Sequence, residues 1–348
     1  MTANVVGIDI GTAGLRAVEV SDAGKGSPTL VRYHEVGLPE GAVNRGEVVE
    51  PNTVAAAIKS LWSAGGFKSK NVVLGMGNHR VLARDLTVPK MSIKRIRESL
   101  PFQVQDMLSV PVADALLDFY PISETEGENG PEINGLLIAA IKEAVQSNVR
   151  AVQLAGLNPV EVDLIPFALS RVIYRGAKSE DAVVQIDVGV ATTTVVVTRA
   201  GVPQFVRLIP AGGGDLTQAL VLRLGITAEQ AEALKRTQGL HSASVTDYQM
   251  ADTIISEVTT ELLTSLRNTV NYFVNTRQNL PVTRIVLTGG GAQLNGFAKA
   301  LGEMTRMPVF SADPSAAVAL GKGVTAQALQ QSRGAFSVAL GLALGSQA

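Results

Sequence analysis

The chain of 348 residues has a formal net charge of −1, 46% hydrophobic residues, 18% charged residues and no cysteine. This length suits two domains or one large bilobed unit, and the apolar content excludes global disorder. The near-zero charge gives no reason to expect a nucleic-acid partner, and the lack of cysteine excludes disulfides and thiol catalysis.

The first 77 residues alternate strands with a helix. Three strands, one helix and one further short strand are expected over 4–11, 14–22, 29–39, 52–67 and 71–77. We expect Asn52 or Thr53 to cap the helix, and Gly65 and Gly66 to end it, because these residue types favour helix starts and stops.

The pattern changes between residues 78 and 159, where it predicts an inserted module. A strand, a helix, two strands and a helix are expected over 80–89, 92–108, 114–122, 133–141 and 142–157. Ser92 should cap the first helix and Pro101 should kink it, because proline lacks a backbone donor. The polar run 123–132 is typical of a turn, so the two strands should form a hairpin around it.

The remainder of the chain repeats the opening pattern. A strand and a helix are expected within 159–176, followed by three strands, three helices and a strand–turn–helix unit over 182–189, 192–201, 202–213, 214–225, 227–239, 245–278 and 284–304. A strand within 307–314 and a final helix close the chain. The phrase "VVGIDIGTAG" at 5–14 returns as "VVQIDVGVAT" at 183–192. Strands alternating with helices in two similar halves predict an α/β protein built by duplication.

Both copies of the repeated phrase carry an aspartate at the end of a strand and a glycine two residues later. The pairs are Asp9 with Gly11 and Asp187 with Gly189. Glycine allows a tight reversal, in which backbone N–H groups converge and a hydroxyl group can join them to hold phosphate oxygens. The candidate hydroxyl groups are those of Thr12, Thr192 and Thr193.

One such turn would be an ordinary hairpin, but two copies half a chain apart indicate a pair of turns that clamp a triphosphate. Asp9 and Asp187 would add negative charge beside an anionic ligand, so we expect Mg²⁺ between them, held through water. Arg16 lies on the strand that leaves the first turn, where it can reach a phosphate.

A third glycine-rich turn follows the apolar strand near residue 284. In "LTGGGAQLNG", the residues Gly289, Gly290 and Gly291 would allow a flat adenine ring to lie close to the backbone. A dinucleotide-binding turn belongs near a first βαβ unit rather than this late in a chain. The three glycines therefore complete a predicted mononucleotide site.

The order of phosphate turn, inserted module, second phosphate turn, long helix and glycine turn resembles the actin/Hsp70/sugar-kinase superfamily. The resemblance spans nearly the whole chain and implies a bilobed fold of duplicated RNase H-like subdomains that binds ATP and Mg²⁺. It also implies that Gly213, in "AGGGDLT", lies near the ribose and phosphates. Glu232, Lys235 and Arg236, in "EALKR", would line the nucleoside.

The position of the inserted module is similar to that in the bacterial FtsA/PilM branch. The stretches "GIDIGTAGLRAVEV", "LPFQVQDMLSVPVAD", "DLIPFALSR", "TAEQAEALKR" and "FSVALGLALG" resemble the PilM family of type IV pilus assembly proteins. This resemblance implies a scaffold that grips the N-terminal tail of a PilN-like inner-membrane protein. The groove for the tail would lie between the first subdomain and the module, around the helix at 92–109.

The resemblance also implies a division of the chain and a location. The first actin-like subdomain would comprise 1–77, 160–180 and 321–348, the SHS2-type module 78–159, the second subdomain 181–222 and 284–320, and the helical subdomain 223–283. We expect no secretory signal and no direct membrane insertion, since the apolar run 335–345 is too short to span a bilayer. The protein is therefore expected in the cytoplasm, held at the inner face of the cell membrane by its partner.

Hydrolysis requires a polar group that orients water for attack. The position that carries this group in hydrolysing relatives matches Pro166, and Asp163 nearby would point elsewhere, so slow or absent turnover is expected. Two alternatives stay open: a filament-forming division protein similar to FtsA, and a small-molecule kinase of the same fold. Self-association and contacts with other pilus components also stay open.

Overall fold

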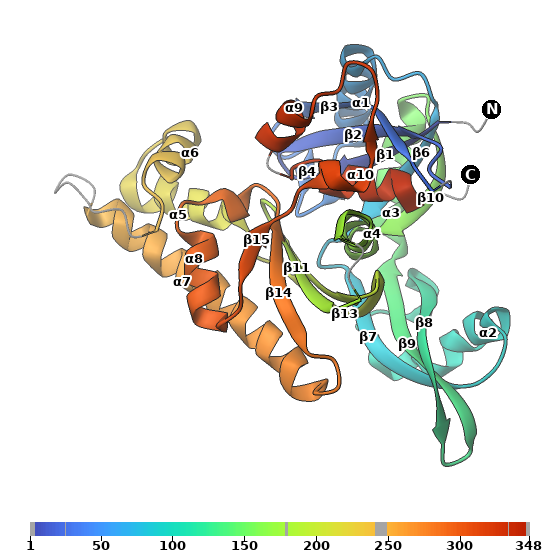
Figure 1. Cartoon of the computed structure of the whole chain (residues 1–348). Helices are drawn as coiled ribbons and strands as arrows, with labels where there is room; N and C mark the ends of the chain where they lie inside the picture. The colour runs from blue at the N-terminus through green and yellow to red at the C-terminus, as the bar shows by residue number, and fades with distance from the viewer. Residues whose placement is uncertain (1–3, 25, 178–179, 241–248, 333, 346–348) are drawn as a thin grey trace.

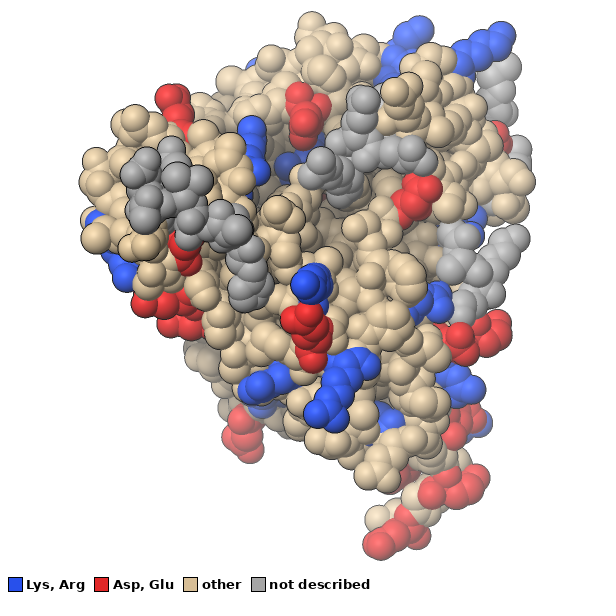
Figure 2. Space-filling model, turned by 60° about the vertical axis from the view of Figure 1, so that its left-hand side comes forward, with Lys and Arg blue, Asp and Glu red and all other residues tan. Residues whose placement is uncertain are grey.

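The computed structural model describes residues 4–24, 26–177, 180–240, 249–332 and 334–345. Figure 1 shows two halves, each built around its own sheet, and a smaller module with a separate sheet beside β13. The surface in Figure 2 carries basic and acidic side chains that are interspersed among uncharged ones.

The first half contains a six-stranded sheet in the order β10-β6-β1-β2-β3-β16. Its strands are β1 (Val5–Ile10), β2 (Gly14–Ser21), β3 (Thr29–Gly37), β6 (Asn71–Met76), β10 (Asn158–Leu164) and β16 (Ala319–Leu320). The first three form an antiparallel meander, while β6 and β10 add in parallel. All six residues of β1 are buried, as expected for a central strand covered on both faces.

The second half repeats this topology in a five-stranded sheet of order β13-β12-β11-β14-β15. Its strands are β11 (Ala182–Val188), β12 (Thr193–Arg199), β13 (Val202–Ile209), β14 (Val282–Thr288) and β15 (Val309–Ser311). Again three strands form an antiparallel meander and two more add in parallel beside the first of them. The predicted duplication is confirmed by this shared strand order.

The helices of the first half are α1 (Pro51–Gly65), α4 (Ile165–Ala177), α9 (Ala326–Gln331) and α10 (Ser337–Gly345). The prediction that Asn52 or Thr53 caps α1 is wrong, because the helix begins one residue after Glu50 with Pro51 in its first turn. Proline has a backbone angle suited to the first helical position and lacks the donor that would be unpaired there. A two-stranded ribbon of β4 (Val43–Asn44) and β5 (Glu47–Val48) precedes α1.

The inserted module contains a three-stranded sheet of order β7-β9-β8. Its elements are β7 (Val81–Pro89), α2 (Ile93–Gln103), β8 (Ala115–Gly127), β9 (Gly130–Ile141) and α3 (Lys142–Leu154), in the predicted order. Ser92 caps α2 by accepting a hydrogen bond from the Arg95 N–H group, as predicted. The helix ends two residues after Pro101, so its predicted extension to 108 is wrong.

The predicted hairpin is present, but its polar segment is mostly strand rather than turn. Only Glu128 and Asn129 separate β8 from β9. Side-chain hydrogen bonds stabilise this polar ladder, including one of 2.9 Å from Asn134 Nδ2 to Thr125 Oγ1 on the facing strand. A polar composition therefore did not prevent strand pairing here.

The second half carries α5 (Gly213–Leu224), α6 (Ala228–Thr237), α7 (Gln249–Thr276) and α8 (Phe297–Thr305). These helices pack on β11 and β14 through an apolar cluster that includes Leu220, Ile254, Leu266 and Phe297. The first four residues of the predicted helix 245–278 lie outside the described residues. Among the helices described, none is long and apolar enough to cross a bilayer.

Candidate nucleotide-binding site

The two predicted phosphate turns have the same hydrogen-bond geometry. In the first, the Gly11 N–H group donates to the Gly14 carbonyl over 3.0 Å. In the second, the Gly189 N–H group donates to the Thr192 carbonyl over the same distance. Each turn directly follows the central strand of its sheet, β1 or β11, so both halves present an equivalent loop.

The aspartates at the ends of these strands lie within electrostatic reach of each other. The pKa of Asp9 is raised to about 6, mainly by burial. The Arg16 guanidinium lowers this pKa, while the charge of Asp187 adds to the rise. Burial also raises the pKa of Asp187, against a hydrogen bond of 2.7 Å that its carboxylate accepts from Thr288 Oγ1. A buried carboxylate, that of Asp9, and a half-buried one, that of Asp187, thus share one electrostatic environment although they come from different halves of the chain.

Arg16 contributes the positive charge of this environment. Its Nη1 atom lies 3.6 Å from Asp9 Oδ2, while its Nε atom donates to Glu35 Oε2 over 3.2 Å. The guanidinium is about one-third exposed, and it lowers the pKa of both Asp9 and Asp187. Arg16 therefore lies at the carboxylate pair rather than on a distant surface.

Glycines bring three backbone segments together beside the second turn. The Gly213 N–H group at the start of α5 donates to the Gly189 carbonyl over 2.9 Å. A Cβ atom on Gly289 would lie 2.4 Å from the Val188 carbonyl oxygen, and one on Gly213 would lie 3.2 Å from the Gly291 Cα atom. Side chains at these positions would fill the space between the end of β11, the start of α5 and the end of β14.

Gly290 differs from its two neighbours. A Cβ atom added there would have none of the described atoms within 4 Å, so this peptide borders open space. The peptide at Gly290 is therefore open between two closely approached glycines, and its contact with an adenine ring stays a prediction.

A polar network joins α5 to α6 beside the same glycines. Lys235 Nζ donates to the Gly213 carbonyl over 2.8 Å, to Thr217 Oγ1 over 2.7 Å and to Glu232 Oε1 over 2.8 Å. Burial raises the pKa of Glu232, but hydrogen bonds from Lys235 and Thr217 outweigh it and the net shift is downward. Arg236 is exposed and adds a favourable charge.

The other predicted residues take different places. The Thr193 side chain is buried and its hydroxyl group donates to the Ala211 carbonyl over 2.7 Å, so it supports the loop before α5. Thr12 and Thr192 are half-buried in the two turns. Asp163 forms an ion pair with Arg171, and Pro166 lies in the first turn of α4.

Two polar residues of this region were missed by sequence reasoning. Thr288 is the last residue of β14, and its hydroxyl group donates a hydrogen bond to the Asp187 carboxylate. A polar residue at the end of an apolar strand is a pattern that could have indicated this role. Thr217 bonds Glu232 and Lys235 from α5, and nothing in the local pattern distinguishes it from other helix residues.

Replacing Asp9 by asparagine is expected to stabilise the nucleotide-free protein. The pKa of Asp9 rises from 3.8 to about 6 on folding, so its ionisation opposes folding and stability falls as the pH rises between these two values. Above about pH 6 the variant should be more stable by on the order of 1–3 kcal/mol, and near pH 4 the difference should vanish.

Urea midpoints measured across this pH range check the Asp9 prediction. Glu35→Gln is the matched control, because Glu35 also contacts Arg16 but its side chain is 59% exposed. If Asp9→Asn and Glu35→Gln change the urea midpoint equally at every pH, the burial of the Asp9 carboxylate does not destabilise the protein.

Comparison with known proteins identifies the fold and the family. Residues 7–347 match the family described as type IV pilus assembly protein PilM. A solved structure described as the PilM-PilN type IV pilus biogenesis complex is 30% identical, with a TM-score of 0.86, over 99% of this chain and 98% of that chain. MreB 5 of Spiroplasma citri bound to AMPPNP shares the fold alone, at 11% identity and a TM-score of 0.56 over 98% of this chain and 95% of that chain.

Cell division proteins are related more distantly. FtsA of Enterococcus hirae is 25% identical over 334 residues, which are 85% of this chain and 75% of the relative. FtsA of Bacillus subtilis is 23% identical over 259 residues, so the match spans 67% of this chain and 58% of that protein. The predicted actin-like ATPase fold is confirmed by these similarities, and the chain belongs to the PilM family of type IV pilus assembly proteins.

Proposed function

We propose that this protein is an ATP-binding scaffold of a type IV pilus or type II secretion-like assembly apparatus. The observation that carries the nucleotide proposal is the pair of carboxylates of Asp9, which is buried, and Asp187, which is half-buried. They lie near the ends of equivalent strands in the two halves and interact electrostatically. The Arg16 guanidinium offsets only one of these two negative charges, so the carboxylates next to the two turns are chemically suited to Mg²⁺ bound to a triphosphate.

The residues that would hold each part of the nucleotide follow from their positions. Asp9 and Asp187 would bind Mg²⁺ through water, and the ion would offset the charge of the triphosphate. Gly11, Gly189 and the hydroxyl groups of Thr12 and Thr192 would surround the phosphates. Gly213, Glu232, Lys235, Arg236 and Gly289 to Gly291 would surround the nucleoside.

Slow or absent hydrolysis follows from the start of α4. Pro166 offers no side-chain acceptor there, and the Asp163 carboxylate accepts a hydrogen bond of 2.7 Å from the Leu164 N–H group while it pairs with Arg171. A carboxylate held by two such partners is poorly placed to orient water. Nucleotide would then act as a conformational ligand, which stabilises the arrangement of the halves that it contacts best.

The partner proposal depends on family membership and on the similar solved complex. We infer that the N-terminal tail of a PilN-like membrane protein binds in a groove between the first half and the inserted module, near α2. The tail would hold the protein at the inner face of the cell membrane. The division into two actin-like subdomains, an SHS2-type module at 78–159 and a helical subdomain at 223–283 belongs to the same proposal.

Calorimetric titration with ATP and Mg²⁺, followed by titration with a peptide of the PilN N-terminal residues, tests this function. Binding of both, without release of phosphate over hours, is the expected result. Absence of nucleotide binding would contradict the scaffold mechanism, and ADP release that depends on an added small substrate would favour a kinase.

Thr217→Val is expected to weaken ATP binding roughly ten-fold, because a hydrogen bond to a charged group contributes about 1.5 kcal/mol or more. The substitution removes the hydroxyl group that positions Glu232 and Lys235, and it leaves both phosphate turns intact. Affinity for Mg²⁺-tripolyphosphate should therefore stay unchanged, and Thr217→Ser should behave like the unmodified protein. An equal loss for both ligands would show a general structural defect.

A further inference from the structure

The inserted module belongs mechanically to the first half. It is inserted between β6 and β10, two neighbouring strands of the first sheet. Its last helix, α3, packs into the core of that sheet through Ala151 and Val152. When the two halves move relative to each other, the module is therefore carried with the first half.

The module nevertheless also contacts the second half, through its strands β7 and β9. Asp85 Oδ2, on β7, lies 2.9 Å from an Nη2 atom of Arg277, the residue that directly follows α7. Val206 of β13 belongs to the same apolar cluster as Val81 of β7 and Leu136 of β9. The contact between β7 and the β13–α7 region thus joins elements that belong to opposite halves.

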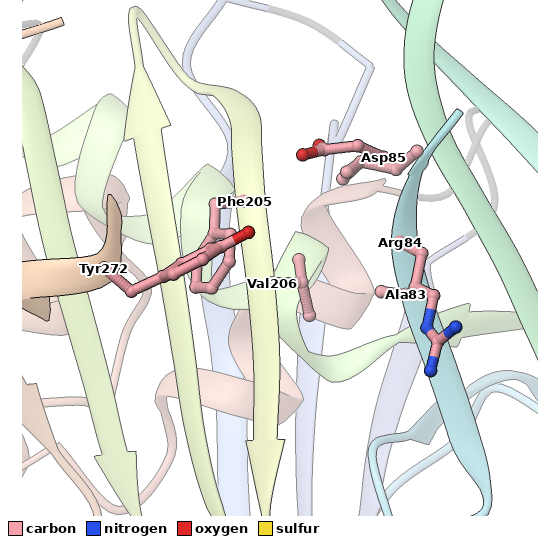
Figure 3. Close-up of a pocket in the computed structure, with 7 residues that line it drawn as sticks. Ala83, Arg84, Asp85, Phe205, Val206 and Tyr272 are labelled. Carbon is pink, nitrogen blue, oxygen red and sulfur yellow. The ribbon is translucent and has the colours of Figure 1, made fainter. Parts of the chain in front are cut away.

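This contact borders a half-open pocket. The pocket has a volume of about 290 Å³, lies away from the proposed nucleotide site and is lined by Ala83, Arg84, Asp85, Phe205, Val206 and Tyr272, among others. Figure 3 shows Ala83 and Asp85 pointing from β7 toward β13, where Val206 faces β7 and Phe205 lies beside Tyr272 of α7. Close-packed cores resist rearrangement, whereas side chains that border an open pocket can move without new clashes.

The ion pair across this contact is weak enough to be made and broken. The Arg277 and Asp85 side chains are 40% and 54% exposed. Half-exposed pairs of this kind contribute little to stability. An ion pair of that strength can respond to the free energy that a bound nucleotide supplies.

Helix α7 connects this contact to the proposed nucleoside site. Its 28 residues extend about 42 Å. Ile254 and Ile255, near its start, pack in one cluster with Leu220 of α5 and Ala231 of α6. Since α5 and α6 carry the network of Thr217, Glu232 and Lys235, a shift of these helices would be transmitted along α7 toward Arg277.

We propose that α7 and the Asp85–Arg277 contact form a joint that carries the nucleotide state to the inserted module. The proposal rests on the proposed function, because it requires nucleotide to draw the two halves together. If the two halves close around a nucleotide, α7 and β13 would move relative to β7, and the pocket between them would change shape. The module forms one wall of the proposed partner groove, so partner affinity would change by the same coupling free energy.

Electron paramagnetic resonance distances test the joint in the full chain. The sequence contains no cysteine, so Glu98→Cys on α2 and Asn275→Cys on α7 supply two thiol groups for spin labels, and both positions are exposed. ATP with Mg²⁺ is expected to shift the distance distribution between the labels. Charge removal in Asp85→Ala should broaden the distribution and abolish the shift, while the swapped pair Asp85→Arg with Arg277→Asp should restore it.

Each other outcome overturns a defined part of the proposal. If calorimetry shows ATP binding and the distribution does not move, the module does not sense the nucleotide. An unchanged shift in Asp85→Ala would show that the ion pair is passive, and the joint as proposed would be wrong. Absence of ATP binding would instead overturn the nucleotide site itself. Melting curves of each variant exclude unfolding as the cause.

Discussion

Asp187→Asn is expected to weaken the binding of Mg²⁺-ATP by about 10- to 100-fold at about pH 8, the range typical when a group that supports a metal site is lost. Asparagine keeps an oxygen for the hydrogen bond from Thr288, which measures 2.7 Å with Asp187. The substitution therefore removes the negative charge and little else. Isothermal titration calorimetry with ATP at saturating Mg²⁺ measures the loss.

Titration of the same variant in EDTA separates the metal from the phosphates. Without Mg²⁺ the Asp187 carboxylate repels the triphosphate. The Asp187→Asn variant should therefore bind metal-free ATP at least as tightly as the unmodified protein does. Asp163→Asn is the control, since Asp163 is also an aspartate at a strand end in the same fold but pairs with Arg171. Unchanged Mg²⁺-ATP affinity in Asp187→Asn would remove this residue from the site.

The duplicated strands and turns, which the sequence predicted and the structure confirms, share a local cause. A strand that ends on aspartate and a glycine that reverses the chain are specified within ten residues, and both occur twice. The structure gives both turns the same hydrogen bond and gives both sheets the same strand order. A repeated local pattern therefore predicted the duplication and the two carboxylates.

The remaining features depend on contacts that no local pattern specifies. Thr193 and Thr192 are neighbours of the same type, and only the approach of the Ala211 carbonyl decides which hydroxyl group is buried. Thr217 acquires its role because α6 places Glu232 and Lys235 against it. Pro51 starts α1 one residue before the predicted caps, because its fixed backbone angle suits the first helical position.

The closing stretch "FSVALGLALG" is another feature whose role needed the structure. Its helix α10 is buried from Ser337 to Leu344, so it is a core helix. A Cβ atom on Gly341 would lie 2.0 Å from the Ala168 carbonyl oxygen of α4, and one on Gly7 of β1 would lie 2.0 Å from the Ala339 carbonyl oxygen. Glycine thus permits α10 to approach α4 and β1 backbone to backbone.

Gly341→Ala is expected to lower the free energy of unfolding by about 3 kcal/mol, the upper part of the range for overpacking a core. The added methyl group meets a backbone carbonyl, which cannot rotate away as a side chain could. A fall in the urea midpoint measures the effect. Gly37→Ala is the matched control, because none of the described atoms lies within 4 Å of its added methyl group, and its midpoint should stay the same or rise slightly. Equal urea midpoints for the two variants would show that α10 can move away from α4 at little cost. The close approach of these two helices would then contribute little to the stability of the first half.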